Sequence, residues 1–460
     1  MTYISNIIIP PESWTKDTDI YIEETYTFKK ASPTKDTSIV LEPTTFTKSS
    51  TKISTCVYDI KFRKGTLRYT YLDFLFPRVK VKQEFEKDVE ICWSNNLDTN
   101  SIDKVSFQAD KFNLRFDSVS LDIMKQVARY PKNGSDLAND IRSGNCRQMQ
   151  KWATSLPSYV VHTSLPWNFS SHDGRGFAFP LYFYDDHHSV QINVSFCPDI
   201  LSLLRVRKRD STTGKWLRLT QNLSNYVEMD FCTFGVPKLH IRVKELTSEE
   251  IDVHKCSLND TSSKECHYRL YDDYITVKQE KPMSEGDVEE IPLNCKTTCK
   301  AIYVLAKNSK AARFHYLSNY TNDDENIKTG YTPIDYVDIY KGMDWEGKLY
   351  SSDYEHAIHI YHSMSCPREN GYIMIPQCDR PHNHVSQSGR SFDKDRIRVA
   401  IRDPDPYLNN ITVSSCDDES TDVSNKKSSS YYIYVVLQVS RKLKPVFDTS
   451  KGRYNFVIDD

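Results

Sequence analysis

The stretch Leu165–Phe196 reads LPWNFSSHDGRGFAFPLYFYDDHHSVQINVSF, and it is the part of the chain that most clearly predicts a fold. Near its end the apolar side chains of Val190, Ile192 and Val194 alternate with polar ones. A period of two predicts a β-strand with one buried and one exposed face. Two segments rich in proline and aromatic residues precede this strand, without a catalytic grouping among them. The stretch therefore indicates β-architecture rather than an active site.

The composition extends this interpretation to the whole chain. With 460 residues the chain is long enough for roughly two to four domains, each with its own core. Its 29 tyrosines favour pleated sheets, whereas only 14 glycines argue against glycine-rich cofactor loops. The net charge of −2 excludes a global basic field, so we expect no direct contact with nucleic acid. A chain this close to neutral can associate with its own copies at little electrostatic cost.

We identify no targeting or membrane segment in the sequence. The N-terminal segment MTYISNIIIPPESW lacks the basic region of a signal peptide. The longest apolar run, Tyr431–Leu437, is shorter than the roughly 20 residues that a membrane span needs. The 12 cysteines are scattered rather than clustered, so we expect mostly reduced thiols in a cytosolic environment.

Strand candidates dominate residues 36–210. The charged stretch Arg205–Trp216, which contains the end of this region, marks the best internal boundary of the chain. Residues 1–35 lack periodicity and are predicted to form an extended arm. Helical spacing predicts one helix that starts at Asp117 as N-cap and ends before Pro131, and a second over Asp136–Trp152. The strands expected here are Ser38–Leu41, Ile53–Phe62, Thr66–Phe76, Val79–Phe85, Val89–Trp93, Tyr159–Thr163, Phe177–Tyr184, His188–Phe196 and Leu201–Arg207.

Residues 211–460 repeat this style, with a short helix near Asp353–His362 and polar insertions over Thr247–Glu265 and Asp417–Ser429. The strands expected here are Tyr226–Phe234, Leu239–Val243, Tyr271–Lys278, Lys300–Ala306, Tyr336–Tyr340, Gly371–Ile375, Arg396–Arg402 and Tyr431–Val439. Many short strands with few helices predict β-sandwiches or jelly rolls, and the length suggests two of them, over 36–210 and 211–460.

Three patches carry a resemblance to a known family. The first runs from Trp93-Ser94-Asn95-Asn96-Leu97 through Ile102–Val105 to Asp117–Ile123, and the second is Leu165–Phe196. The third contains Arg313–Asn319, Pro333–Tyr340, Tyr354–His362, Glu369–Ile373, Gln387-Ser388-Gly389 and Phe392–Ile397. In this order the patches resemble the double jelly-roll major capsid proteins of nucleocytoplasmic large DNA viruses, of the iridovirus, phycodnavirus and asfarvirus type. The chain looks like a divergent member, since the family's proline before Ser-Gly is absent.

The resemblance implies an all-β fold of two consecutive eight-stranded jelly rolls, with a few short helices in the loops between strands. It implies a structural protein rather than an enzyme, in which three chains form a pseudo-hexagonal capsomer and capsomers tile an icosahedral shell. The polar insertions would point outward, and the arm would lie beneath the jelly rolls. The implied partners are further copies of the chain, minor capsid and penton proteins, and an inner membrane. The implied location is the virion capsid, assembled in the host cytoplasm.

Several groupings contain metal-ligand residue types, but their spacing does not fit a known site. His356, His359 and His362 recur at i, i+3 and i+6 without an HExxH motif, which favours polar positions on a short helix. Three other groupings are Cys256, Cys266, Cys295 and Cys299; His382 and His384 near Cys366 and Cys378; and Thr213-Gly214-Lys215. For all three, ordinary solvated or unligated side chains are favoured. A zinc site or a disulfide within the group of four cysteines stays open.

Charged side chains suggest two further hypotheses. His187-His188 beside Asp185-Asp186 could form a pH-sensitive interface, while a solvated turn is the simpler interpretation. Arg396, Arg398 and Arg402 form a basic stripe on one strand, for which lattice salt bridges or a solvated face are favoured over nucleic-acid contact.

We therefore predict no catalytic, cofactor-binding or metal-binding residues. Two alternatives to a major capsid protein stay open. One is a scaffold or minor capsid protein of the same fold. The other is a jelly-roll carbohydrate-binding or cupin-like protein, which a bound metal or a measurable glycan affinity would support.

Overall fold

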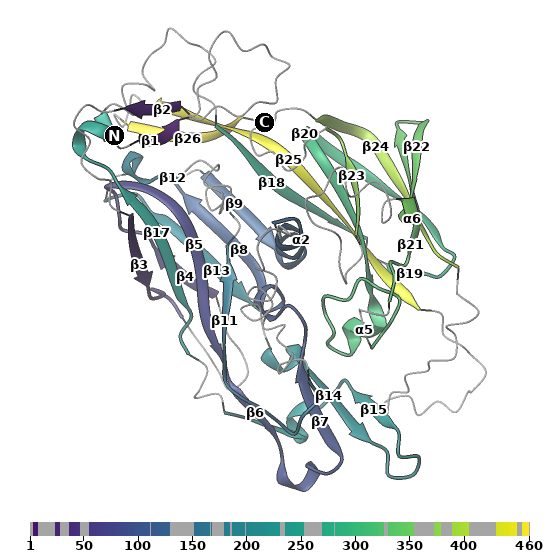
Figure 1. Ribbon diagram of the computed structural model, residues 1–460. Helices are drawn as coiled ribbons and strands as arrows, with labels where there is room; N and C mark the ends of the chain where they lie inside the picture. Colours follow the sequence, from purple (N-terminus) through teal and green to yellow (C-terminus); the bar gives the residue numbers. More distant parts are fainter. Residues whose placement is uncertain are drawn as a thin grey trace.

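The computed structural model is built almost entirely of antiparallel β-sheet, as predicted from the strand patterns. It describes residues 3–7, 24–27, 36–46, 55–110, 112–128, 151–165, 167, 179–184, 186–197, 199–230, 235–252, 269–279, 281–325, 330–353, 372–378, 389–403, 429–448 and 453–459. Figure 1 shows two groups of strands, one at the lower left and one at the upper right, with helix α2 between them.

The first group of strands contains two larger sheets. One has the order β11-β5-β17-β3, with β12 also on β5, and the other has the order β4-β13-β8-β9. The bounds are β3 Asp36–Leu41, β4 Thr55–Asp59, β5 Gly65–Phe76, β8 Ile102–Ala109, β9 Phe112–Asp117, β11 Tyr159–Ser164, β12 Phe179–Pro180, β13 Val190–Phe196 and β17 Lys238–Glu245. The sheets touch through Phe74 of β5 and Phe196 of β13, whose ring centroids lie 5.6 Å apart.

Strand β13 confirms the alternation in the opening stretch. Val190, Ile192 and Val194 are buried, and the intervening side chains are half-buried. The strand pairs with β4 on one edge and β8 on the other, so it is internal to its sheet. The same stretch also supplies Trp167 and Phe179, whose rings pack 5.7 and 4.7 Å from that of Phe107. Its aromatic residues therefore serve the core.

Two three-stranded sheets complete the first group, with the orders β10-β6-β16 and β15-β14-β7. The bounds are β6 Arg78–Val81, β7 Val89–Trp93, β10 Ser155–Leu156, β14 Leu204–Arg209, β15 Trp216–Leu219 and β16 Val227–Asp230. Strands β15, β16 and β17 lie after residue 211 in the sequence, yet each of them pairs with a strand that lies before residue 211. By hydrogen bonding, the first group thus extends to Glu245.

The second group is one sheet of nine strands with the central order β18-β25-β20-β24-β21-β22. The bounds are β18 Arg269–Lys278, β19 Met283–Ser284, β20 Val288–Asn308, β21 Ile334–Lys341, β22 Asp344–Tyr350, β23 Ile373–Pro376, β24 Arg390–Ile401, β25 Ser430–Asp448 and β26 Arg453–Asp459. Strand β25 is internal, as its apolar sequence predicts, because it pairs with both β18 and β20. A separate pair, β1 Tyr3–Ile7 with β2 Glu24–Thr27, lies in the predicted arm.

The helices are short and lie between strands. Helix α2 (Ser118–Ala128) confirms the first predicted helix, and Asp117 caps it, since its Oδ1 accepts the Ser120 backbone N–H at 2.7 Å. Further helical segments are α1 Leu97–Asn100, α5 Ser309–Arg313, α6 Ser351–Asp353, η1 Gln83–Phe85, η3 Leu181–Phe183, η4 Ile200–Leu203 and η5 Leu223–Asn225. Residues 248–252 are also helical. Residues 129–150 and 354–371 lie outside the described residues, and with them most of the other two predicted helices. None of the described helices is long and apolar enough to cross a membrane.

Candidate functional site

The main polar site of the described residues lies where the two groups of strands meet. It begins at Ser94, directly after β7, where the backbone leaves the sheet. Asn96 then adopts a left-handed conformation (φ 47°), which ends the extended backbone and starts α1. This turn brings Asn95 against the second group, where its Nδ2 donates to the Ser318 carbonyl at 2.8 Å and its Oδ1 accepts the Ser318 N–H at 3.2 Å. Leu317 N–H donates to Ser94 Oγ at 3.2 Å.

Asp122 of α2 is the centre of this site. The carboxylate is buried, with the residue only 2% exposed, and it accepts three hydroxyl hydrogen bonds. Thr99 of α1 donates to Oδ1, while Ser318 and Tyr320 of the second group donate to Oδ2 at 2.6 and 3.1 Å. A buried carboxylate is tolerated only when such donors replace its water. Asp122 therefore fixes α1, α2 and the second group to one another.

The charge of Asp122 acts on its neighbours. Burial, and then the adjacent carboxylate, raise the pKa of the Tyr320 phenol well above its ordinary value, so Tyr320 stays a neutral donor. Burial lowers the pKa of the Lys307 ammonium, and the attraction of Asp122 opposes this shift. A second contact lies beside them, because Ser120 and Thr276 share a hydrogen bond of 2.7 Å and Thr276 also reaches Asp117 Oδ1 at 3.3 Å.

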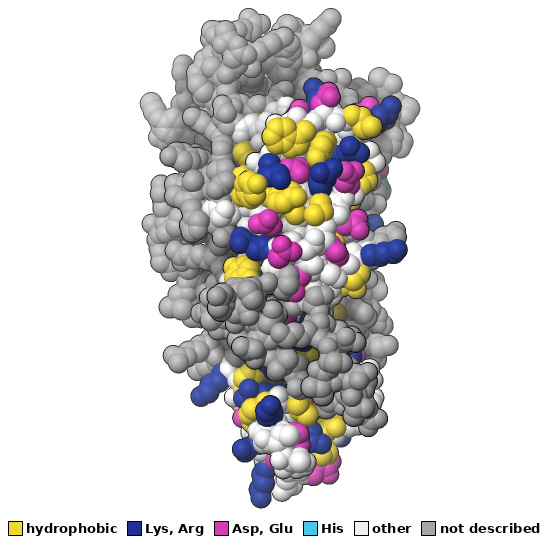
Figure 2. All heavy atoms as spheres, turned by 90° about the vertical axis from the view of Figure 1, so that its right-hand side faces the viewer, with side chains coloured by type: hydrophobic (Ala, Val, Ile, Leu, Met, Phe, Trp, Pro, Cys, Tyr) yellow, Lys and Arg dark blue, Asp and Glu magenta, His cyan; other side chains and the backbone are white. Residues whose placement is uncertain are grey.

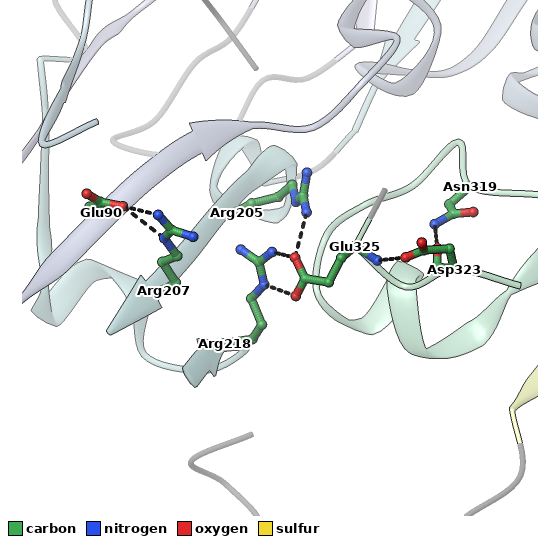
Figure 3. A network of polar contacts seen from close by, with 7 residues as sticks. All are labelled: Glu90, Arg205, Arg207, Arg218, Asn319, Asp323 and Glu325. Atoms are coloured by element: carbon green, nitrogen blue, oxygen red, sulfur yellow. Dashed lines mark hydrogen bonds and ion pairs between the residues drawn. The ribbon is translucent and has the colours of Figure 1, made fainter. Parts of the chain in front are cut away.

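A cluster of arginines forms the other end of the junction (Figure 3). Glu325 of the second group receives a forked ion pair from Arg218 of β15, with Nε to Oε1 at 2.9 Å, while Arg205 Nη2 lies 4.0 Å from Oε2. Asp323 Oδ1 accepts the Glu325 N–H at 2.8 Å, and Asn319 donates to the Asp323 carbonyl at 2.7 Å. The loop that carries Glu325 is thus braced by its own hydrogen bonds.

Aromatic rings compensate the burial of these arginines. Arg205 lies 3.9 Å from the ring centroid of Tyr316, and the Trp152 ring lies within reach of Arg205, Arg207 and Arg218, at 5.3, 4.5 and 4.2 Å. Arg207 also pairs with Glu90, its Nε 2.9 Å from Oε2. Burial, and then the like charge of Arg205, lower the pKa of Arg218 to about 9.

His315 supplies a further link. Its backbone is left-handed (φ 62°), and its Nδ1 lies 2.8 Å from the Leu204 carbonyl of the first group. Burial lowers the pKa of the imidazole, so His315 is held neutral in this contact. Taken together, carboxylates, hydroxyls, amides and guanidinium groups hold the two groups of strands in one register. These contacts are suited to holding the two groups of strands at a fixed angle.

Three segments of the first and third patches singled out in the sequence meet at this junction. Trp93–Leu97 supplies Asn95, Asp117–Ile123 supplies Asp122, and Arg313–Asn319 supplies His315 and Ser318. Sequence reasoning did not single out Asp122, Ser318 or Glu325 individually. The available signal was the run of small polar residues in Ser94-Asn95-Asn96 and Ser318-Asn319, which is unusual beside apolar strands.

The structure places few of the other candidate residues together. His356, His359, His362, Cys366, His382, His384, Cys256, Cys266 and Asp185 lie outside the described residues. Cys295 and Cys299 are buried thiols on β20, and burial raises the pKa of Cys299. Thr213-Gly214-Lys215 forms the β14–β15 turn, where Asp210 accepts the Thr213 hydroxyl at 2.7 Å. Within the described ranges, the His, Cys, Asp and Glu side chains form no group of three that could hold a metal ion.

The charged candidates are engaged within the chain. Arg396 and Arg398 both lie 3.0 Å from the Glu290 carboxylate, and Arg402 donates to Ser351 Oγ and to the Ile334 carbonyl. His188 is buried, and its carbonyl accepts from Arg63 at 2.8 Å. The basic stripe is therefore balanced by acidic and polar partners on β20, β21 and α6.

No family model and no curated protein sequence matches the chain. VP54 of the virus PBCV-1 superposes with a TM-score of 0.61 at 8% identity, over 95% of this chain and 99% of its own. The Faustovirus major capsid protein superposes with a TM-score of 0.59 at 10% identity, over 91% of this chain and 92% of its own. The chain has the double jelly-roll fold of major capsid proteins.

A chain from the Sputnik virophage structure shares the double jelly roll, with a TM-score of 0.53 at 7% identity, over 99% of this chain and 93% of its own. Because these alignments span nearly the full length of every chain, the likeness covers both jelly rolls and their relative placement. The predicted fold class and the resemblance of fold are therefore confirmed.

Proposed function

We propose that this chain is a capsid protein of a large icosahedral double-stranded DNA virus, in which three copies form one capsomer. The main support is that the double jelly roll aligns over 95% of this chain and 99% of VP54, so the alignment includes both halves of the chain. Two similar jelly rolls per chain give a trimer six similar units and hence a pseudo-hexagonal outline. Such an outline tiles a surface, and closed homo-oligomers are the common state of self-associating proteins.

The junction fits this role. A protein that forms part of a shell must keep the angle between its two jelly rolls fixed under load. The contacts of Asp122 and Glu325 prevent a change of this angle. We place the boundary between the jelly rolls after Glu245, because β15, β16 and β17 hydrogen-bond to strands of the first group. The arm 1–35 is proposed to lie beneath the jelly rolls, facing minor capsid proteins or an inner membrane. Penton proteins are the proposed partners at the vertices, and assembly is proposed to take place in the host cytoplasm.

Size-exclusion chromatography with light scattering, followed by negative-stain imaging, tests the proposal. Three copies of 53.5 kDa give about 160 kDa, and the particles should have a hexagonal outline. A stable monomer without such an outline would contradict it.

A scaffold or minor capsid protein of the same fold is the second candidate, since the fold is shared by both roles. Detection of the chain in purified mature virions, at a copy number that accounts for the shell, would favour the major capsid protein.

A further inference from the structure

The outward face of β20, β24, β21 and β22 is an unusual surface, which we call the outer face. Cross-strand register arranges its side chains in three rows. The first is Trp345, Tyr340, Arg396 and Pro292; the second is Lys348, Asp338, Arg398 and Glu290; the third is Tyr350, Tyr336, Ala400 and Val288. Figure 2 shows this side of the molecule, where apolar side chains alternate with charged ones of both signs.

The first and third rows are mostly apolar, with Arg396 as the charged exception. Ala400 is buried and Tyr336 and Tyr340 are half-buried, whereas the other apolar side chains of these rows are exposed. Trp345 is 59% exposed, Val288 49% and Tyr350 43%, and Met343 at the tip of the β21–β22 hairpin reaches 84%. Tyrosine, tryptophan, methionine and arginine are the residues enriched at protein–protein interfaces. Among the described strands β22 pairs with β21 alone, so the outer face ends at a sheet edge.

The middle row is charged but neutral overall, with two cations and two carboxylates in alternation across the four strands. Lys348 lies 3.8 Å from Asp338, and Arg398 lies 3.0 Å from Glu290 and 4.0 Å from Asp338. Nucleic acid or another strongly charged partner would require a net charge that this row lacks.

The tyrosine rings of the outer face are not open platforms for a sugar ring. Lys348 Nζ lies 3.6 Å from the centroid of Tyr336, and the guanidinium groups of Arg396 and Arg398 lie 5.1 and 5.0 Å from that of Tyr340. Cations thus already cover these two rings. The surface is better suited to a flat protein partner than to a glycan.

The order of the rows is complementary to itself. A two-fold axis parallel to the strands keeps each row opposite its own copy but reverses the strand order, so β22 faces β20 and β21 faces β24. Lys348 then meets Glu290, and Arg398 comes to lie opposite the position of Asp338, whose side chain is only 5% exposed. In the apolar rows Trp345 meets Pro292, and Tyr350 meets Val288. Packing of two sheets with their strands nearly aligned is a common geometry.

We propose that the outer face docks on the outer face of a second copy of the chain, across this two-fold axis. The inference rests on the proposed self-association but names a different contact, because an isologous pair closes on itself and cannot build a three-fold capsomer. The contact would therefore join neighbouring capsomers.

The expected contact is small. Four strands about 4.8 Å apart and three rows about 7 Å apart give an area at the low end of specific interfaces. Weak single contacts suit a shell, because each capsomer repeats them and the repeated contacts add in avidity.

Sedimentation of the purified full-length chain over a concentration series tests the docking. Wild type should form capsomers that associate further as the concentration rises. Trp345→Glu and Tyr350→Glu should leave the capsomer intact and raise the concentration of half-association at least about tenfold, as expected for aromatic interface residues. Val160→Glu is the matched control, since Val160 is 44% exposed in the first group, and it should behave as wild type.

Each other outcome has a distinct meaning. If wild type remains a monomer, the capsomer proposal fails together with this inference. If capsomers form and the outer-face variants associate like wild type, only the docking is refuted. If the variants dissolve the capsomer itself, the face belongs to the three-fold contact and the two-fold register is refuted.

A short bis-maleimide cross-linker tests the register directly. Positions 290 and 348 lie three strands apart in one chain, about 14 Å, so the double variant Glu290→Cys/Lys348→Cys should cross-link between copies. Lys348→Cys alone should give no more dimer than wild type. A strong dimer band from that single variant would place position 348 against itself and overturn the proposed axis.

Discussion

Removal of the Asp122 carboxylate should loosen the junction more than any other single change in α2. In Asp122→Ala the hydroxyls of Thr99, Ser318 and Tyr320 lose their common acceptor. A buried donor without a partner costs about 1–3 kcal/mol. Thr99 Oγ1 keeps a second acceptor in the Asn96 carbonyl at 3.2 Å, so the hydroxyls of Ser318 and Tyr320 set an upper range of about 2–6 kcal/mol. Relaxation and the entry of water reduce this cost, and we expect about 3–5 kcal/mol, the range for breaking a buried charged network.

The assay is urea unfolding of the full chain at fixed protein concentration, followed by circular dichroism. Asp122→Asn keeps the shape and one acceptor oxygen, so its loss should be smaller, about 1–3 kcal/mol. Asp103→Ala is the matched control, because Asp103 lies on β8 with its side chain 54% exposed and should change stability by less than about 0.5 kcal/mol.

Hydrogen exchange should locate the effect. In Asp122→Ala the amides of α1 and of residues 315–321 should exchange faster, while those of β17, which pairs with β3 and β5 on the far side of the first group, should keep their protection. Equal stability of Asp122→Ala and Asp103→Ala would refute the role given to this carboxylate.

Three further outcomes follow from other contacts. Glu325→Gln removes the carboxylate between two buried arginines and should cost about 3 kcal/mol, whereas Glu325→Gln combined with Arg218→Met should recover part of it in a double-mutant cycle. Gly389→Ala should destabilise by more than about 1 kcal/mol, because φ is +148° and a Cβ would lie 2.4 Å from the Cys299 carbonyl oxygen; an unchanged melting temperature would contradict this. Stability should fall as pH rises above 9, because burial raises the pKa of Cys56 from 9.0 to about 12 and raises the pKa of Tyr58 well above its ordinary 10.0. The folded protein then holds protons that the unfolded chain has lost. Exposed tyrosines such as Tyr350 ionise first, and the phenolate absorbance of buried tyrosines such as Tyr58 should appear only together with unfolding.

The alternation of apolar and polar residues was sufficient to predict a strand where one face of the strand is buried and the other contacts solvent. Strand β13 follows this rule and was predicted. The inner half of β20 was also predicted, although its residues 299–306 are buried on both faces. The outer half of β20 was missed, because Glu289, Glu290 and Pro292 make its sequence resemble a loop. Tertiary pairing with β24 holds these residues extended in spite of their low strand propensity.

The junction could be predicted only in outline. Asn95 and Asp122 bond to a residue about two hundred positions away in the sequence, and no local pattern encodes which distant hydroxyl completes a carboxylate. The signature residue Gly389 is a similar case. The sequence showed a Ser-Gly pair, and the structure supplies its reason in the close approach of the β20 backbone.

The chemistry of the junction also determines what holds its angle. Apolar contacts are non-directional and would let two sheets slide past each other, whereas hydrogen bonds weaken steeply with distance and angle. Thr99, Ser318 and Tyr320 converge on Asp122 in a single register, so the polar network selects one angle between the jelly rolls. Asp122→Ala should therefore broaden the outline of negatively stained capsomers even at temperatures where both jelly rolls stay folded. Sharp outlines that match wild type, from a variant whose stability has fallen, would show that apolar packing alone sets the angle.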